Sequence, residues 1–592
     1  MKLKHSKRPA TAPKNGTFRR LLKQLMRHPF VLLAVFLTGL LAGACMIAAP
    51  YMIGVSIDMM RVGEALNWSR LGGVLLILII LFLLNALFQW LLTLLANRVS
   101  VLATAEIRKA AFDNLSRLSL SFVDSHPSGD FVSRLTNDAD AITDGLNQLM
   151  IQLGSGVLTM VGSLVVMLMI DARAALAAVA VTPLIFVVTS VINRNSVSMY
   201  RRQAMAAGEL NAFADETIAG QVVARSLGAE PVFQNRFKEL NSKLYVVGQK
   251  AQFYSSLTNP GARFVNNIAY VLVGILACLS GLAGTITVGK ISSLLSYVTQ
   301  FAKPVNEFAA VSSQFQNTLA GCERLFELID AASEDLRPSL PNLVVDRGEV
   351  KFDSVSFSYV KGQPWIKGLD LHVPPRGQVA IVGPTGAGKT TLVNLLMNFY
   401  ALDSGRIVID DADIQSVNVA SLRQSFGMVL QDSWLFSGTV RANIAYGRPD
   451  ASDAEVVAAA RAAYAHDLIT RLPKGYDTVL TDNGAALSVG EKQLLTIARA
   501  FLTDPHILIL DEATSNIDTR TERLIQRAFD KMMRDRTSFV IAHRLSTVRD
   551  AHLILVMQDG RIVQKGAHDE LVKLPGLYRS MYKSQFEHTH IS

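Results

Sequence analysis

A glycine-rich stretch, GPTGAGKT at residues 383–390, has the residue types and spacing needed to bind phosphate. It follows an apolar segment, VAIV, and opens another, TTLVNLLM, so a strand, a loop and a helix are expected in that order. The glycines would let backbone N–H groups wrap an anion, Lys389 would reach the β- and γ-phosphates of a nucleotide, and Thr390 would offer a hydroxyl to Mg²⁺. The residues predicted to bind the phosphates are Gly383, Pro384, Thr385, Gly386, Ala387, Gly388, Lys389, Thr390 and Thr391.

Two adjacent carboxylates end a second apolar segment, HILILDEATS at 506–515. Asp511 suits association with Mg²⁺, and Glu512 suits a base that polarises water. A helix cap or a surface turn would explain the same pattern, but the phosphate loop in the same chain favours the catalytic interpretation. His543 follows another largely apolar strand, 538–542, and phosphate sites collect at the ends of such strands.

A third stretch, ALSVGEKQ at 486–493, precedes the apolar run LLTIARAFL. Ser488 and Glu491 have the spacing of a capping box, in which each side chain bonds the backbone N–H of the other at the start of a helix. The stretch is therefore either a helix cap alone or a cap that also serves a catalytic site, and its surroundings decide between the two.

The composition places these motifs in a membrane protein. Half of the 592 residues are hydrophobic and only 18% are charged, against about a quarter in ordinary soluble proteins. The net charge of +9 is concentrated at the N-terminus, where no Asp or Glu precedes Asp58. This distribution fits a cytosolic segment that faces lipid, and no nucleic-acid partner is expected. The three cysteines are scattered, with no disulfide or metal-binding spacing: Cys45, Cys278 and Cys322.

Five stretches without charge are long enough to cross a bilayer, which takes about 20 apolar residues. They are 29–57, 71–97, 145–170, 174–193 and 264–289. A sixth apolar stretch, 291–320, is interrupted by Lys303 and Glu307. An even number of spans places both termini on one side, and the basic N-terminus makes that side the cytosol. A basic amphipathic helix at 17–27 is expected to lie on the inner leaflet before the first span.

The motifs resemble those of ABC transporters when they are taken together and in order. They are GPTGAGKT, VLQD at 429–432, ALSVGEKQ, ILILDEATSNID at 507–518 and IAHR at 541–544. The resemblance covers nearly the whole chain and implies a six-helix, all-α transmembrane exporter domain fused to an α/β P-loop nucleotide-binding domain. The implied parts are a cytosolic N-terminus with an elbow helix (1–28), a transmembrane domain with six spans and two coupling helices (29–325), a linker (326–345) and the nucleotide-binding domain (346–592). The coupling helices are expected at the tips of 124–140 and 208–230.

The resemblance also implies ATP and Mg²⁺ as ligands and assigns a role to each matching residue. Tyr359 would stack on adenine, and Gln431 would sense Mg²⁺ together with Thr390 and Asp511. Glu512 would be the catalytic base and His543 would contact the γ-phosphate, with Lys389 and Gln431 completing the catalytic set. The residues of the third stretch that would contact nucleotide are Ser488, Gly490 and Glu491.

ABC transporters usually have LSGGQ where this chain has LSVGE, and that loop caps the ATP bound on the opposite domain. Val489 puts a branched side chain where glycine allows close approach to phosphate. Glu491 replaces a neutral amide, and a negative charge about 8 Å from a phosphate charge costs roughly 2 kcal/mol at an effective dielectric near 20. This departure favours a heterodimer in which a second half-transporter supplies an intact loop, and it leaves a homodimer possible.

The sequence thus predicts an ATP-hydrolysing transporter subunit that spans the bacterial inner (plasma) membrane several times, with both termini cytoplasmic. The expected substrates are small hydrophobic or amphiphilic compounds, exported in multidrug fashion by alternating access. A lipid flippase, a siderophore importer of the same layout, and an ATP-gated channel or regulator are the alternatives; the spans exclude a soluble ABC ATPase that acts on nucleic acid. Lys303 and Glu307 are predicted to pair or to contact substrate, and Asn266, Asn267 and Gln300 are weaker candidates for the substrate cavity.

Overall fold

The computed structural model describes residues 15–60, 67–360, 362–431, 433–512, 517–542 and 548–587. Within these ranges, the side chains of 15, 186, 306, 308–313, 512 and 585–587 are not described. The chain divides into two compact units. One, here called the helical unit, comprises Met1–Arg117 and His126–Ala332; the other, the sheet unit, comprises Leu118–Ser125 and Ser333–Ser592.

The helical unit contains five helical runs that are long and apolar enough to cross a membrane, among the residues described. They are α2 (Pro29–Asp58), α3 (Trp68–Leu115), the run Ser128–Ile170, α8 (Ala172–Ala219) and the run Glu230–Leu282. The third run consists of α5 (Ser128–Ser133), η1 (Arg134–Asp138), α6 (Ala139–Ile151), η2 (Gln152–Gly156) and α7 (Val157–Ile170), and the fifth of α10 (Glu230–Ser256) and α11 (Thr258–Leu282). Each of the first four runs contains one of the predicted spans, whereas the fifth run ends at Leu282 and covers only residues 264–282 of the predicted span 264–289.

The sixth predicted span lies in α12 (Val288–Asp330), a helix of 43 residues. This helix is not among the five runs above, which were recognised from the described residues by length and composition. Lys303 and Glu307 interrupt its apolar stretch, as the sequence indicates. The sixth span therefore remains a prediction.

Small residues and carboxylates at the helix ends hold the helical unit together. A side chain at Gly39 on α2 would meet the carbonyl oxygen of Gly154 on η2 at 2.4 Å, so only glycine permits this approach. Asp58 at the end of α2 accepts hydrogen bonds from the Thr287 hydroxyl (2.5 Å) and the Gly289 N–H (2.8 Å), which caps the start of α12. The predicted amphipathic helix is present as α1 (Asn15–Leu25).

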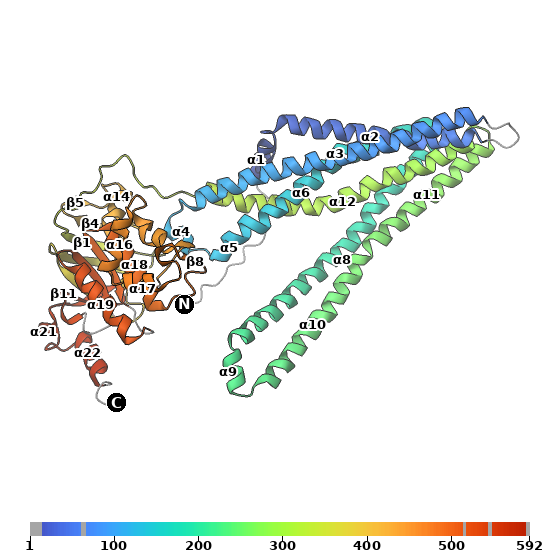
Figure 1. The fold of residues 1–592 in the computed structure, drawn as a ribbon. Helices are drawn as coiled ribbons and strands as arrows, with labels where there is room; N and C mark the ends of the chain where they lie inside the picture. The colour runs from blue at the N-terminus through green and yellow to red at the C-terminus, as the bar shows by residue number, and fades with distance from the viewer. Residues whose placement is uncertain are drawn as a thin grey trace. The chain divides into compact units, whose positions relative to one another are not determined.

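The helices α8 and α10 form a long antiparallel pair, joined at the tip by the short helix α9 (Gln221–Ser226) (Figure 1). The tip falls within the segment 208–230, where the sequence predicts a coupling helix. Its apolar side chains are largely solvent-exposed, with Val222 81% exposed and Leu227 75% exposed. Such exposure is typical of a surface that contacts another protein.

The sheet unit is built on a six-stranded sheet whose order is β12-β11-β3-β10-β9-β6. The five strands from β11 to β6 are parallel to their neighbours, and β12 is an antiparallel edge. Their bounds are β3 (Gln378–Val382), β6 (Phe426–Val429), β9 (Ile507–Glu512), β10 (Thr537–Ala542), β11 (Leu553–Gln558) and β12 (Arg561–Gly566). A second, antiparallel sheet has the order β2-β1-β4-β5, with β1 (Val350–Phe357), β2 (Ile366–Val373), β4 (Ser404–Ile409) and β5 (Ala412–Asp413), and β7 (Gly438–Thr439) pairs with β8 (Val479–Leu480).

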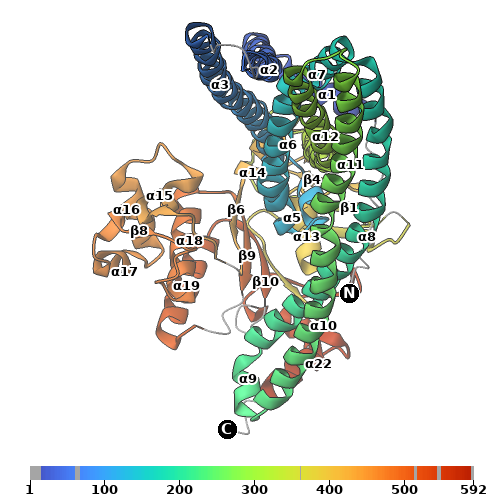
Figure 2. The same cartoon turned by 90° about the vertical axis from the view of Figure 1, so that its right-hand side faces the viewer.

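Side chains along each strand alternate between the two faces of the parallel sheet, and the two faces pack into two different hydrophobic cores. In β3, Ala380 and Val382 pack into one buried cluster, while Val379 and Ile381 pack into the other. The first cluster includes side chains of α16, α18 and α19, which Figure 2 shows grouped on one side of β9 and β10. A strand buried on both faces is a rigid support for the loop that follows it.

The helices of the sheet unit are mostly short. They are α4 (Leu120–Asp124), α13 (Lys389–Leu396), α14 (Val419–Gln424), α15 (Val440–Ile444), η3 (Ala445–Gly447), α16 (Asp453–Ala462), α17 (His466–Arg471), η4 (Gly475–Asp477), α18 (Val489–Thr503), α19 (Thr519–Met533), α21 (His568–Leu571) and α22 (Leu577–Glu587).

Candidate functional site

The phosphate loop lies between β3 and α13, as predicted. Gly386 (φ +81°) and Gly388 (φ +102°) adopt left-handed backbone conformations that side chains other than glycine disfavour. At Gly383 a side chain would come within 2.2 Å of the Met557 carbonyl oxygen on β11. The glycines thus meet two demands: they turn the chain sharply, and they let the loop lie against the neighbouring strand.

Lys389, the first residue of α13, bends back across this loop. Its ammonium donates hydrogen bonds to the carbonyl oxygens of Gly383 (2.6 Å) and Pro384 (3.2 Å). Burial lowers the pKa of Lys389, and the nearby carboxylate of Asp511 opposes that shift. A buried ammonium held mainly by neutral carbonyls is a strong site for an anion, because a phosphate would supply the missing countercharge.

The parallel register brings the predicted acidic residues to the same edge as the phosphate loop. Ile541 on β10 pairs with Ile381 on β3 and with Asp511 on β9, so three strands end side by side. Glu512 pairs with Ala542 through the backbone. The next residue after Ala542 is His543, which lies outside the described residues, as does the side chain of Glu512. Their roles stay predictions, and the described backbone leads both toward this edge.

Tyr359, the predicted adenine platform, is half exposed and is held by the helix that follows the phosphate loop. Its hydroxyl lies 2.9 Å from the hydroxyl of Thr391, a buried residue in the first turn of α13. Its ring meets Phe357 edge to face at a centroid distance of 4.8 Å, and Tyr400 at 5.3 Å. A ring fixed on one side and open on the other is suited to stacking on a planar base.

The stretch ALSVGEKQ forms the predicted capping box at the start of α18. The Ser488 hydroxyl accepts from the Glu491 N–H (3.3 Å), and the Glu491 carboxylate accepts from the Ser488 N–H (2.8 Å). A side chain at Gly490 would meet Thr521 and Ile517 at 2.5 and 2.8 Å, so this glycine is required by packing. The cap places a carboxylate at a helix end that would otherwise attract anions.

Comparison with known families matches both halves of the chain. Residues 32–305 match the ABC transporter transmembrane region, and residues 366–515 match the ABC transporter family. A fatty acid ABC transporter ATP-binding/permease protein of Mycobacterium bovis is 44% identical over 524 residues, which is 88% of this chain and 83% of that protein. The chain belongs to the ABC transporter family.

Two further relatives agree in fold and organisation. An ATP-dependent lipid A-core flippase of Syntrophus aciditrophicus is 33% identical over 577 residues, covering 96% of this chain and 94% of that protein. A solved structure of a bacterial Atm1-family ABC exporter with ATP bound superposes with a TM-score of 0.77 at 31% identity, over 97% of this chain and 99% of that one. This ABC transporter therefore has a helical exporter domain fused to a nucleotide-binding domain, and it is an ATP-hydrolysing, multi-pass membrane protein.

The residues predicted to hold Mg²⁺ supply oxygen atoms, the ligand type that this ion prefers. Thr390 is exposed in the first turn of α13, and Asp511 lies close enough to Lys389 to act on its pKa. Gln431 lies two residues beyond the end of β6, whose Val429 pairs with Leu510, the neighbour of Asp511. One carboxylate together with neutral oxygen atoms fits Mg²⁺ when the phosphates of a nucleotide supply further ligands. Among the described residues, no group of three or more His, Cys, Asp or Glu side chains could hold a metal ion by itself.

One contact at the site was missed at the sequence level. The Tyr400 hydroxyl, whose ring touches Tyr359, donates a 2.5 Å hydrogen bond to Asp124 at the end of α4. Burial raises the pKa of Tyr400, and the Asp124 carboxylate raises it further. Only Asp124 of this helix lies in the predicted coupling segment 124–140, and from Ser128 onwards that segment forms α5, η1 and the start of α6. Pro127 explains the break, because proline disfavours helical conformation in the residue before it.

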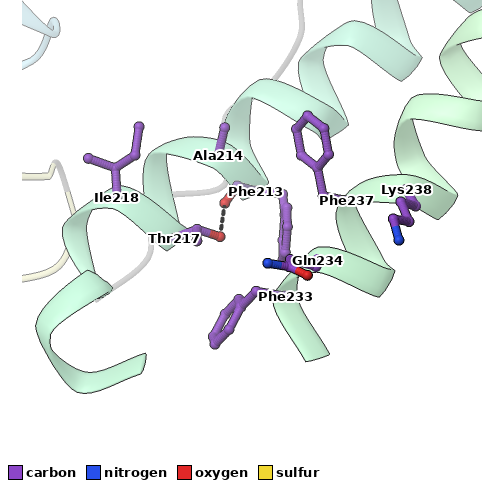
Figure 3. A pocket seen from close by; sticks show the side chains of 8 residues that line it. All are labelled: Phe213, Ala214, Thr217, Ile218, Phe233, Gln234, Phe237 and Lys238. Atoms are coloured by element: carbon purple, nitrogen blue, oxygen red, sulfur yellow. Dashed lines mark hydrogen bonds between the residues drawn. The ribbon is translucent and has the colours of Figure 1, made fainter. Parts of the chain in front are cut away.

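The second predicted coupling segment carries an apolar cavity of about 350 Å³ near the tip of α8 and α10. Phe213 from α8 and Phe233 from α10 stack at a centroid distance of 6.1 Å, and Phe237 lies beside them (Figure 3). The Thr217 hydroxyl is turned to the Phe213 carbonyl, at 2.7 Å, so the lining remains apolar.

Four of the predicted substrate-cavity residues do lie together. Lys303 and Glu307 on α12 and Asn266 and Asn267 on α11 line one cavity of about 470 Å³. Gln300 does not line it; its amide donates to the Met46 carbonyl on α2 at 3.1 Å.

Replacing Tyr359 with alanine is expected to weaken ATP binding about tenfold, because stacking on a base contributes about 1–3 kcal/mol. Tyr359→Phe keeps the ring and should stay within about threefold of wild type, since it loses only the hydrogen bond to Thr391, at the lower end of the net range of about 0.5–1.5 kcal/mol. Calorimetric titration with ATP checks this, and tripolyphosphate, which lacks the base, should bind both variants as it binds wild type. Equal loss of ATP and tripolyphosphate affinity in the alanine variant would contradict stacking.

Replacing Tyr400 with phenylalanine removes the hydrogen bond to Asp124 and keeps the ring beside Tyr359. We expect substrate-stimulated ATP hydrolysis to fall at least about threefold while basal hydrolysis stays within about twofold, because hydrogen bonds to charged groups contribute about 1.5–3 kcal/mol. Tyr464→Phe is the matched control, since the Tyr464 hydroxyl makes no hydrogen bond with a described residue. Full substrate stimulation of ATP hydrolysis in the Tyr400→Phe variant would show that this hydrogen bond does not couple α4 to the nucleotide site.

Proposed function

We propose that this chain is one half of an ATP-driven exporter that moves small hydrophobic or amphiphilic compounds across the bacterial plasma membrane, with both termini in the cytoplasm. The observation that carries the proposal is the alignment of the phosphate loop with Asp511 and Glu512 at one sheet edge. The relatives named as a fatty acid transporter and a lipid A-core flippase favour lipid-like cargo. A lipid flippase is therefore the second candidate.

ATP binding would draw two nucleotide-binding domains together, and the coupling segments would carry that movement to the spans. The bond between Asp124 and Tyr400 supports a role for α4 in this transmission. The exposed apolar tip around α9 supports a second contact, with the nucleotide-binding domain of the other half-transporter. Repeated closure and reopening would give alternating access to a cavity between the spans.

In hydrolysis, Lys389 would hold the β- and γ-phosphates, and Glu512 would take a proton from the attacking water. Thr390, Gln431 and Asp511 would hold Mg²⁺, which would neutralise phosphate charge when bound. His543 would contact the γ-phosphate. A channel or regulator gated by ATP would not need Glu512 and His543, so their presence supports a transporter that turns over.

ABC exporters function as dimers, and we propose that this one pairs with a different half-transporter. Here Glu491 is engaged in the capping box, so its carboxylate stands at the helix end that would face the ATP of the opposite domain. Roughly 2 kcal/mol of repulsion from such a charge corresponds to about a 30-fold weaker grip on phosphate. A partner with an intact loop would then complete the active site on this chain. The LSVGE loop of this chain would cover a site on the partner that hydrolyses ATP weakly or not at all.

Glu512→Gln should leave ATP binding within about threefold of wild type and lower turnover at least about 100-fold, because the amide cannot accept the proton from water. Binding is measured by titration and turnover by phosphate release, both with the partner present. Asp530→Asn, an exposed carboxylate on α19, is the control and should hydrolyse normally. Near-normal turnover in Glu512→Gln would refute the assignment of the base.

The heterodimer predicts that the chain purified alone hydrolyses ATP weakly. Restoring LSGGQ with Val489→Gly and Glu491→Gln should raise that activity about tenfold, since it removes the charge and the branched side chain while glutamine preserves the capping box. A stable dimer of the unmodified chain with vigorous, substrate-stimulated hydrolysis would argue for a homodimer.

A further inference from the structure

The cavity between α11 and α12 has a polar, charged lining within otherwise apolar helices. Arg263, Asn266 and Asn267 line it from α11, and Thr299, Lys303 and Glu307 line it from α12. On α11, Asn266 and Asn267 follow Arg263 by three and four residues, and on α12 the three residues are four apart, so each set shares one helix face. Polar side chains gathered on one face of a membrane helix mark a functional site by default.

The charges in this cavity do not balance. Two cations, Arg263 and Lys303, stand against one carboxylate, Glu307, which leaves a net charge of +1. The Lys303 ammonium lies 4.0 Å from Glu307, at the outer limit of an ion pair. Arg263 makes no ion pair or hydrogen bond with any side chain that the structure describes. An uncompensated cation in this setting favours an anionic ligand.

The position of Arg263 suggests which part of a ligand lies there. The 26 residues that follow it, 264–289, carry no charge. Arg263 therefore stands at the border between an apolar span and the polar extension of α10. On the apolar side of that border the cavity continues past Tyr270 and Val298. A ligand with a charged head group at this border and an apolar chain directed along the span would match both the charged and the apolar part of the cavity.

Asn266 provides a further polar group. Its Oδ1 atom is buried without a hydrogen-bond partner among the described residues. The oxygen and nitrogen of a side-chain amide can exchange places by rotation, so Asn266 can turn its NH₂ group toward an anion. A ligand oxygen between Arg263 and Asn266 would then be bound by a charged and a neutral donor.

We propose that this cavity binds the anionic head group, a carboxylate or a phosphate, of an amphiphile with an apolar chain, and that Arg263 and Lys303 select it. The inference rests on the proposed function, since it names the chemical class of the transported compound. Glu307 limits the attraction, which would let the head group leave the cavity again.

The test is equilibrium binding to the full-length protein with its partner in nanodiscs of uncharged lipid. The probes are radiolabelled oleate, oleoyl lysophosphatidate and the uncharged methyl oleate. We expect at least one anionic probe to bind at least about tenfold more tightly than methyl oleate. Tighter binding of oleate assigns a carboxylate, and tighter binding of lysophosphatidate assigns a phosphate; both support the proposal.

Charge variants give shifts of opposite sign. Arg263→Ala with Lys303→Ala should weaken anionic-probe binding at least about tenfold, and Glu307→Gln should strengthen it about threefold or more. Arg263→Lys should retain most of the affinity because it keeps the charge. Lys290→Ala removes a cation from the same helix outside the cavity and should change nothing.

The proposal would be overturned if neither anionic probe bound more tightly than methyl oleate, or if the double variant bound the preferred anionic probe as tightly as the wild type does. Basal ATP hydrolysis is measured on the same samples to show that each variant is folded. Binding does not require turnover, so the two failures are distinguishable: normal hydrolysis without charge-dependent binding refutes the anionic cavity alone, whereas absent hydrolysis in the wild-type complex refutes the proposed function.

Discussion

The nucleotide site depends on the parallel register of the strands β3, β10 and β9. Parallel strands end at the same edge, so the pairing of Ile541 with both Ile381 and Asp511 brings the phosphate loop close to the carboxylates at the end of β9. Gly383 and Asp511 are 128 positions apart in sequence. A slip of one residue would turn Ala380 and Val382 from one core to the other. Burial of the sheet on both faces therefore sets the strand register, and with it the position of the phosphate loop relative to the carboxylates on β9.

The stretch ALSVGEKQ at 486–493 affects both local structure and nucleotide binding. Ser488 and Glu491 satisfy each other's backbone N–H groups, which stabilises the start of α18. The same bonds hold a negative charge at a helix end that is otherwise suited to phosphate. The capping box does not require this charge, since glutamine at position 491 would form it as well. The charge therefore disfavours phosphate without being needed for the helix, and a second, different half-transporter with an intact loop would avoid it.

Much of the site could be predicted from sequence because its signals are local. The phosphate loop, the strand before the acidic pair and the capping box each occupy a few consecutive residues, and the structure has all three. The bond from Tyr400 to Asp124 joins residues 276 apart and has no local signature. Arg263 escaped notice for another reason: a cation at the edge of an apolar stretch resembles an ordinary span border until α12 is placed beside it. Composition alone does not establish the sixth span, because Lys303 and Glu307, which line the cavity, interrupt its apolar stretch.

We propose that the phosphate loop of this chain, with Asp511 and Glu512, forms the hydrolysing half-site of an asymmetric dimer. The most direct measurement is to trap ADP with vanadate in the purified transporter, using a photoreactive ATP analogue, and to map the labelled peptides. We expect one trapped nucleotide per dimer, attached to this chain near Tyr359. Two trapped nucleotides per dimer in equal amounts on both subunits, or label on the partner alone, would contradict it.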